Sequence, residues 1–275
     1  MFERIEFEGP QVGSSLFTDS GSGHLVDGDP GSDVASKPLR SVLIANGASG
    51  LGLLLATRFS EQGYEVFVSS KNEARLEDLE AQASQVTTFV CDLALPGVTG
   101  GMLAEIGERA GSLDVLIYLS GEPIERNFAV SATLDGIAEE IEAELSGPIN
   151  LVELAMPLLR GERPATIVFV TSAHAVSTSP TVPVHAAAMA GLRAFARSAR
   201  HQLAGMAVRV LEIVPPLGQI GADSDLTHRM IAAATLKALR AGEREVFVGP
   251  SRPVRRDIGG KRPARVTPWH IAGYG

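Results

Sequence analysis

A glycine-rich segment follows the first strong apolar run of the chain. It reads Asn-Gly-Ala-Ser-Gly-Leu-Gly over Asn46–Gly52, between the apolar run Ser41–Ala45 and a segment with helical apolar periodicity from Leu53. Small residues let the backbone approach a pyrophosphate closely, and the N-terminus of the following helix offers unpaired N–H groups and a partial positive charge. The order of strand, glycine-rich turn and helix therefore predicts a dinucleotide-binding βαβ unit over about Ser41–Lys71.

The elements that must position this turn have the pattern of a parallel sheet with crossover helices. Short apolar runs alternate with amphipathic segments of helical length, which predicts one doubly wound, Rossmann-type α/β domain with a parallel sheet of about seven strands. The expected strands are Ser41–Ala45, Glu65–Val68, Thr87–Val90, Asp114–Leu119, Thr166–Thr171, Val208–Val214 and Glu245–Val248. Helices are expected to end at Gly63 and Gly111 and to occupy Leu134–Leu159 and Val184–Leu203.

Two segments outside this domain differ from it in composition. The domain, including its substrate loop, is expected to cover residues 39–250. Residues 1–38 are rich in Gly, Ser and Asp, and residues 251–275 are basic. Such compositions bury too little apolar surface to offset the entropy of ordering the chain. We expect a flexible N-terminal extension and a solvated basic tail.

The acidic charge balance opposes several classes of partner. The formal net charge is −8 and the sequence pI is about 5.3, whereas nucleic acid and anionic membrane surfaces attract basic proteins. Cys91 is the only cysteine, which excludes an internal disulfide framework and a cysteine-built zinc site. No basic and apolar signal pattern opens the chain, and no apolar window reaches the roughly 18 residues that span a bilayer. We expect a cytoplasmic protein with a small-molecule substrate and no metal.

Together with later motifs, the glycine-rich segment resembles the short-chain dehydrogenase/reductase family, whose nucleotide loop reads T-G-x-x-x-G-x-G. Aligned on Gly50 and Gly52, the family threonine falls on Ala45 and the first glycine on Asn46. Asparagine tolerates positive φ better than other non-glycine residues, so this change is compatible with the turn. The resemblance extends over Ser41–Gly249.

The resemblance implies a nicotinamide cofactor and the residues that bind it. Lys71 stands where the family has a basic residue for the 2′-phosphate of NADP(H), and no acidic residue occupies this strand end. Asp92 and Leu93 match the adenine-contacting pair. Gly121 is the glycine that lets the chain pass close to the cofactor, and Pro215 begins the turn after the sixth strand. The expected cofactor site comprises Asn46, Gly47, Ser49, Gly50, Leu51, Gly52, Ser70, Lys71, Asp92, Leu93, Gly121 and Pro215.

The catalytic motif of the family is changed at three of its four positions. The family uses a serine after the fifth strand, a tyrosine about thirteen residues later in Y-x-x-x-K, and an asparagine on the preceding long helix. Ser172 matches the serine, but His185 stands for the tyrosine, Met189 for the lysine and Glu144 for the asparagine. Ser172, His185 and Glu144 are the candidate catalytic residues that the resemblance implies. His174, in the loop after Ser172, is expected to be an exposed loop histidine.

The substitutions at the tyrosine and lysine positions are mutually consistent. A histidine titrates near pH 6.5 without help, and a neighbouring cation would only lower its pKa. The imidazole of His185 would, however, lie roughly 2 Å nearer the helix than a tyrosine hydroxyl, and a misplacement of about 1 Å can cost ~10²-fold in rate. Glu144 is expected to orient His185 or to stabilise its charged form. A rebuilt site and a site freed from selection both remain open.

Three functions are compatible with these residues. The first is an unusual NADPH-dependent reductase, acting on a substrate that needs no general acid, such as an iminium ion, or assisted by Ser172 and His185. The second is a non-redox isomerase, cyclase or dehydratase that uses His185 and Glu144. The third is a catalytically silent, NADP(H)-binding regulatory protein. Fold alone does not choose among them.

Two further expectations follow from the resemblance. Residues Gly218–Asp225 match the variable substrate loop of the family. The helices near Glu144 and Val184 resemble those of the family's four-helix dimer interface, with Leu192, Phe195 and the alanines on the packing face. A homodimer or homotetramer is therefore predicted.

Overall fold

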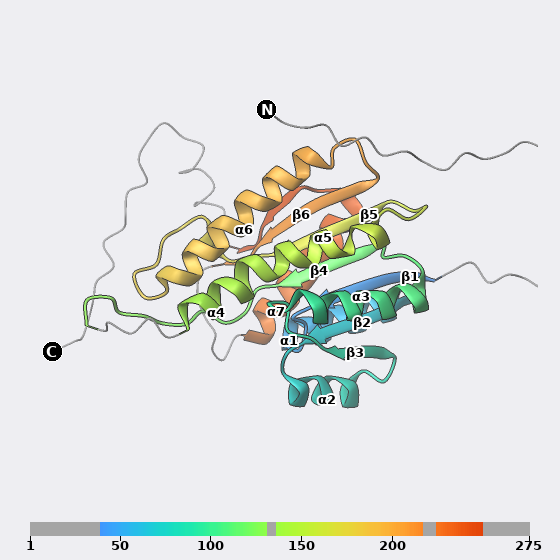
Figure 1. Cartoon of the computed structure of the whole chain (residues 1–275), viewed down its shortest axis with the longest axis horizontal. Coiled ribbons are helices and arrows are strands. Elements are labelled where there is room, and N and C mark those ends of the chain that lie inside the picture. Colours follow the sequence, from blue (N-terminus) through green and yellow to red (C-terminus); the bar gives the residue numbers. More distant parts are fainter. Residues whose placement is uncertain (1–38, 131–135, 217–223, 250–275) are drawn as a thin grey trace, which may run out of the picture. The chain divides into compact units, whose positions relative to one another are not determined.

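A parallel β-sheet forms the centre of the protein. The computed structural model describes residues 39–130, 136–216 and 224–249, and in these residues the sheet has seven strands in the order β3-β2-β1-β4-β5-β6-β7 (Figure 1). Every neighbouring pair is parallel. The strands are β1 Arg40–Ala45, β2 Tyr64–Ser70, β3 Val86–Val90, β4 Val115–Leu119, β5 Ala165–Val170, β6 Val208–Val214 and β7 Glu245–Phe247. The predicted doubly wound fold is confirmed.

Helices cover both faces of this sheet. They are α1 Gly50–Ser60, α2 Glu73–Gln82, α3 Pro96–Ala110, α4 Ile137–Ile141, the π-helical turn η1 Glu142–Ser146, α5 Gly147–Leu159, the 3₁₀ turn η2 Ala173–Ala175, α6 Pro183–Gln202 and α7 Ser224–Ala241. Along β1, Leu43 and Ala45 enter an apolar cluster closed by α3, α5 and α6, whereas Val42 and Ile44 enter a second cluster closed by α1, α2 and α7. Because both faces are buried, the central strands β1, β4 and β5 are mostly apolar.

The strand order reverses beside β1. The chain passes from β1 outward to β2 and β3, and α3 then returns it to β4 on the other side of β1. In doubly wound sheets the loops that leave two such strands diverge and open a crevice at their carboxyl ends. The loops that follow β1 and β4 contain Asn46–Gly52 and Gly121. The fold therefore brings the expected cofactor residues to one edge of the sheet.

The long helix expected over Leu134–Leu159 is divided into α4, η1 and α5, with residues 131–135 outside the described part of the chain. Pro148 has no N–H to donate to the carbonyl of Glu144, and in a regular α-helix its ring would clash with that carbonyl. The N–H of Gly147 bonds instead to the carbonyl of Glu142. This π-helical turn is the local irregularity that carries Glu144.

Most other predicted boundaries lie within two residues of the observed ones. Helix α1 ends at Ser60, and Gly63 lies in the following turn with a φ of 76°. Asp225, expected at the end of the substrate loop, lies in the first turn of α7 instead. Residues 217–223 of that loop, the N-terminal extension and the basic tail lie outside the described residues.

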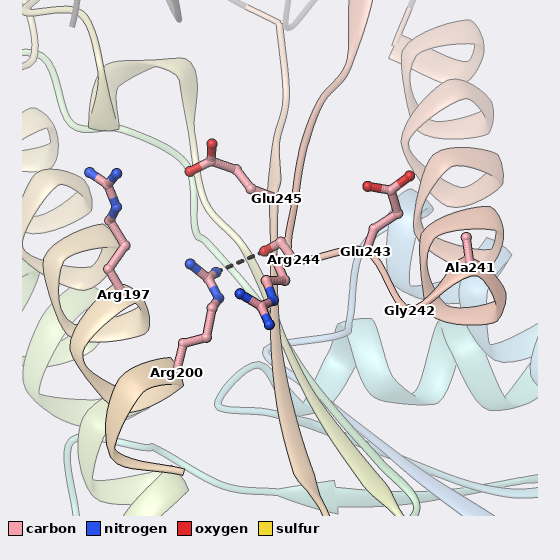
Figure 2. A pocket seen from close by; sticks show the side chains of 7 residues that line it. All are labelled: Arg197, Arg200, Ala241, Gly242, Glu243, Arg244 and Glu245. Atoms are coloured by element: carbon pink, nitrogen blue, oxygen red, sulfur yellow. Dashed lines mark hydrogen bonds between the residues drawn. The ribbon is translucent and has the colours of Figure 1, made fainter. Parts of the chain in front are cut away.

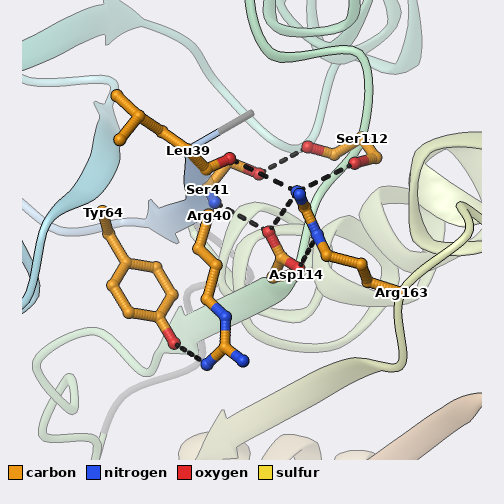
Figure 3. A network of polar contacts seen from close by, with 7 residues as sticks. All are labelled: Leu39, Arg40, Ser41, Tyr64, Ser112, Asp114 and Arg163. Carbon is orange, nitrogen blue, oxygen red and sulfur yellow. Dashed lines mark hydrogen bonds and ion pairs between the residues drawn. The ribbon is translucent and has the colours of Figure 1, made fainter. Parts of the chain in front are cut away.

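A hydrogen-bonded ion pair joins the amino ends of three central strands (Figure 3). Asp114, directly before β4, accepts hydrogen bonds from the guanidinium of Arg163 at 2.7 and 2.9 Å and from the backbone N–H of Ser41 at 2.8 Å. The hydroxyl of Ser41 donates to the carbonyl of Ser112. Because Ser41 belongs to β1 and Arg163 lies just before β5, these contacts hold the sheet together at the edge opposite the candidate site.

Candidate active site

The glycine-rich loop after β1 is shaped by close backbone contacts. Asn46 has the expected positive φ, at 55°, and its side-chain amide donates to the carbonyl of Leu119 in β4 at 2.9 Å. A Cβ atom on Gly47 would lie 2.7 Å from the carbonyl oxygen of Ile44, and one on Gly52 would lie 1.8 Å from that of Gly47. Any side chain at either glycine would therefore push the loop apart.

The start of α1 lies directly after this loop. Ser49 caps the helix, because its hydroxyl accepts a hydrogen bond from the N–H of Gly52 at 3.2 Å. The remaining first-turn N–H groups of a helix have no acceptor within the helix. Gly50 faces α7, since a Cβ atom on it would lie 3.0 Å from Nδ1 of His228. The position of His228 beside Gly50 was not predicted, because no local sequence pattern relates α7 to the glycine-rich loop.

The other expected cofactor residues follow the carboxyl ends of neighbouring strands. Ser70 ends β2, and its hydroxyl accepts from the N–H of Asn72 at 3.1 Å. Asp92 follows β3 and accepts from the N–H of Ala94 at 3.0 Å. Four more expected residues lie along the same edge, and they are the exposed Lys71, the buried Leu93, and Gly121 and Pro215 after β4 and β6.

The carboxyl group of Glu144 is buried between η1 and the end of β4. Its Oε1 accepts a hydrogen bond from the N–H of Gly121 at 2.9 Å, and its Oε2 accepts one from the hydroxyl of Tyr118 at 3.1 Å. Burial raises the pKa of Glu144 to about 7, although these two hydrogen bonds and the charge of Lys71 act in the opposite direction. The expected pairing with His185 is absent from the hydrogen bonds of the described residues. Tyr118 is the partner that sequence reasoning missed.

His185 lies in the first turn of α6 and is 2% exposed. Burial, and then the nearby His174, lower its pKa to about 4, so the expectation that this histidine titrates near pH 6.5 is wrong. Its Nδ1 is buried without a hydrogen-bond partner among the described residues. This low pKa keeps the imidazole in its neutral form at pH 7.

His174 is half-buried beside His185, and not an exposed loop histidine as expected. The two ring centroids are 5.9 Å apart and the rings are nearly perpendicular, at 85°. Ser172 caps η2, with its hydroxyl accepting from the N–H of His174 at 3.2 Å. The fold thus brings Ser172, His174 and His185 together, while Glu144 makes its hydrogen bonds elsewhere.

Met189 lies one turn after His185 and is fully buried in the core. The next turn of α6 carries Arg193, whose guanidinium bonds to Glu212 and Glu245 at 2.7 Å each. Glu212 also accepts from the hydroxyl of Thr171 at 3.0 Å. Arg193 therefore anchors α6 to β6 and β7, and its charge is already neutralised by two carboxylates.

A pocket of about 620 Å³ lies between the C-terminal half of α6 and the start of β7 (Figure 2). Its lining residues are Arg197, Arg200, Ala241, Gly242, Glu243, Arg244 and Glu245, and Arg200 donates to the carbonyl of Arg244 at 2.8 Å. None of the expected site residues lines it, so this pocket is separate from the candidate active site. In the described ranges, no three metal-ligating side chains cluster, and no helix is long and apolar enough to cross a membrane.

Comparison with known proteins defines the class of this protein. The family model described as short chain dehydrogenase matches residues 40–229. The uncharacterized oxidoreductase DltE of Bacillus subtilis (strain 168) is 32% identical over 220 residues, which cover 75% of this chain and 86% of that protein. The chain therefore belongs to the short-chain dehydrogenase family, whose members are oxidoreductases that bind nicotinamide cofactors.

Two solved structures share the fold. A short-chain oxidoreductase of metagenomic origin in complex with NADP has a TM-score of 0.66 and 19% identity, covering 76% of this chain and 96% of that one. A short-chain dehydrogenase/reductase from Burkholderia phymatum in complex with NAD has a TM-score of 0.69 and 17% identity, covering 80% and 94%. Because the two neighbours hold different cofactors, the likeness does not choose between them.

The raised pKa of Glu144 predicts a pH-dependent effect of Glu144→Gln on stability. The folded carboxyl keeps its proton to about pH 7 and the unfolded one only to about pH 4.5, so wild-type stability falls as the pH rises through this window. Across this pH window, the free energy of unfolding of the variant should rise by on the order of 2 kcal/mol relative to that of the wild type. Urea denaturation between pH 5 and 8 measures this difference. Glu153→Gln, at an exposed position on α5, should show no such trend; a pH-independent difference for Glu144→Gln would contradict the assignment.

Proposed function

We propose that this protein is an NADP(H)-dependent reductase whose substrate is already cationic at the reacting carbon, such as an iminium ion. The observation that carries the proposal is the loss of the family's proton-donating tyrosine and of the lysine that assists it. The tyrosine position holds a buried, neutral His185 and the lysine position a buried Met189. Hydride transfer to a ketone needs a proton for the forming alkoxide, but hydride transfer to an iminium carbon yields a neutral amine and needs none.

The charge of the site supports the same class of substrate. Replacing lysine by Met189 removes a cation that would repel an iminium ion, and replacing asparagine by Glu144 adds a group that is partly negative at pH 7. Because the carboxyl is buried, this charge is poorly screened by solvent. The carboxylate thus favours a cation in the crevice, and the substitutions act together.

The backbone of the glycine-rich loop supports the proposed cofactor. At Gly47 and Gly52 the backbone of the loop packs so closely that no side chain would fit, in the segment where a pyrophosphate would approach the backbone. When bound, the cofactor supplies the hydride. Lys71 supplies the charge that favours a 2′-phosphate. Gly121 makes room for the carboxyl of Glu144, because a Cβ atom at this position would lie 2.4 Å from its Oε1.

A second candidate follows from the pKa of Glu144. A carboxyl that titrates near pH 7 is well matched to general acid–base catalysis at neutral pH. An isomerase or dehydratase that used Glu144 would not consume the cofactor. Cofactor turnover therefore separates this candidate from the reductase.

The proposed NADP(H) preference rests on Lys71. We expect NADPH to bind more tightly than NADH by about 1–2 kcal/mol, the contribution of a charge-assisted contact to the 2′-phosphate. Lys71→Ala should remove this margin and leave the affinity for NADH unchanged. Isothermal titration calorimetry with both cofactors measures it. Equal affinities in the wild type, or a preference that survives the substitution, would reject the role of Lys71.

The proposed substrate class is tested by comparing a permanently cationic N-alkyl iminium ion with an aryl ketone. With NADPH, the wild type should reduce the iminium ion, and its kcat/KM for the ketone should be lower by 10²-fold or more, about the usual contribution of a general acid. Glu144→Gln should slow iminium reduction by about tenfold through loss of the negative charge.

The matched comparison is the variant with Glu144→Asn, His185→Tyr and Met189→Lys, which restores the family motif. It should gain ketone reduction, because Ser172 is retained, and lose iminium reduction. Ordinary ketone turnover by the wild type, unaffected by His185→Ala, would show that a proton reaches the substrate by another route and would reject the proposal.

The predicted homodimer or homotetramer stays a proposal, with a corrected packing face. Leu192 is fully buried inside the protomer, so it does not lie on an outer face as expected, whereas Phe195 is half-buried and packs edge-on against Phe169. The exposed side of α6 carries Ala187, Ala190 and Ala194, small residues that permit close helix packing. We expect light scattering to give at least twice the 28.9 kDa chain mass at micromolar concentration. A monomer would exclude the assembly, and Ala190→Arg should produce one.

A further inference from the structure

His228, on the second turn of α7, lies against the glycine-rich loop. A Cβ atom built on Gly50 would lie 3.0 Å from its Nδ1 and 3.2 Å from its Cε1, and among the described residues no other group beyond the neighbouring backbone comes within 4 Å of that position. The middle glycine of the motif thus makes room for an imidazole, whereas Gly47 and Gly52 make room for backbone. The reason for a glycine at this position is therefore the neighbouring side chain.

The packing of α1 against α7 places His228 beside Gly50, where α1 begins. Both helices contribute to one apolar cluster, through Leu55 of α1 and Ile231 and Ala232 of α7. Both also follow the carboxyl end of a strand, since β1 precedes α1 and β6 precedes α7. Side chains on a helix lean toward its N-terminus. A residue on the second turn of α7 therefore reaches the level at which α1 begins.

We propose that His228 binds the pyrophosphate of the dinucleotide, an inference that rests on the proposed cofactor. The N-terminus of α1 offers backbone N–H groups to a phosphate. The half-buried imidazole of His228 offers a ring N–H to the same phosphate from helix α7. Hydrogen bonds to charged acceptors are stronger than those between neutral groups. Helix α7 thereby supplies one wall of the phosphate site.

His228 and Lys71 act on different phosphates in this arrangement. Lys71 follows β2, where the resemblance implies the 2′-phosphate, whereas His228 lies over the first residue of α1. The affinity of a ligand that has a pyrophosphate but lacks a 2′-phosphate should change when His228 is substituted but not when Lys71 is. A ligand with only the 2′-phosphate should respond to Lys71 alone.

The experiment measures the affinities of NADPH, ADP-ribose and adenosine 2′-monophosphate by calorimetry. Loss of a hydrogen bond to a charged group corresponds to about 10- to 100-fold in affinity. His228→Leu, which retains volume but no donor, should weaken NADPH and ADP-ribose by that factor and leave adenosine 2′-monophosphate unchanged. Lys71→Ala should give the reverse selectivity. His228→Gln, which keeps a donor, should lie between His228→Leu and the wild type.

The matched control is His201→Leu, at an exposed histidine near the end of α6, and it should change no affinity. Imidazole resonances of His228 in the wild type should also shift on titration with inorganic pyrophosphate, a test that needs no variant to fold. Equal affinity of wild type and His228→Leu for ADP-ribose, or equal weakening of all three ligands, would overturn the inference while the cofactor assignment stands. If the wild type bound no dinucleotide, the proposed function itself would fail.

Discussion

The carboxyl group of Glu144 connects the π-helical turn η1 to strand β4 and the loop after it, and the candidate site depends on this connection. It accepts from the N–H of Gly121 at the end of the β4 strand and from the hydroxyl of Tyr118 within it, while its own backbone belongs to the π-helical turn. The turn exists because Pro148 cannot complete a regular helix. The backbone constraint imposed by Pro148 thus determines where the buried carboxyl of Glu144 lies.

The other changes in the site are understood from that charge. A lysine at the position of Met189 would pair with a carboxylate at Glu144 or repel a cationic substrate, and either outcome would change the field in the crevice. The buried methionine adds no charge. His185 is neutral at pH 7 because burial disfavours its cationic form. In the proposed site, the carboxyl of Glu144 is thus the group whose pKa lies near neutrality.

The sequence predicted the fold well and the site only in part, for physical reasons that differ. Strand and helix positions follow from local periodicity, and the turn at Asn46 follows from residue type and spacing. The pKa of His185 depends on burial by distant segments, and the contact of His228 with Gly50 depends on how α7 packs on α1. No local pattern encodes either. The division of the long helix before Pro148 was not predicted from the sequence, although proline inside a helix removes a hydrogen-bond donor.

The two edges of the sheet satisfy their buried polar groups differently. At the amino edge, Asp114 accepts three hydrogen bonds from Arg163 and Ser41. At the carboxyl edge, buried atoms of Ser69, His174 and His185 have no partner among the described residues. An unpaired buried polar atom costs about 1–3 kcal/mol, and natural proteins accept such costs chiefly at functional sites. The hydrogen-bonded ion pair at the amino edge thus helps to offset the cost of the unpaired polar atoms at the edge where we place the reaction.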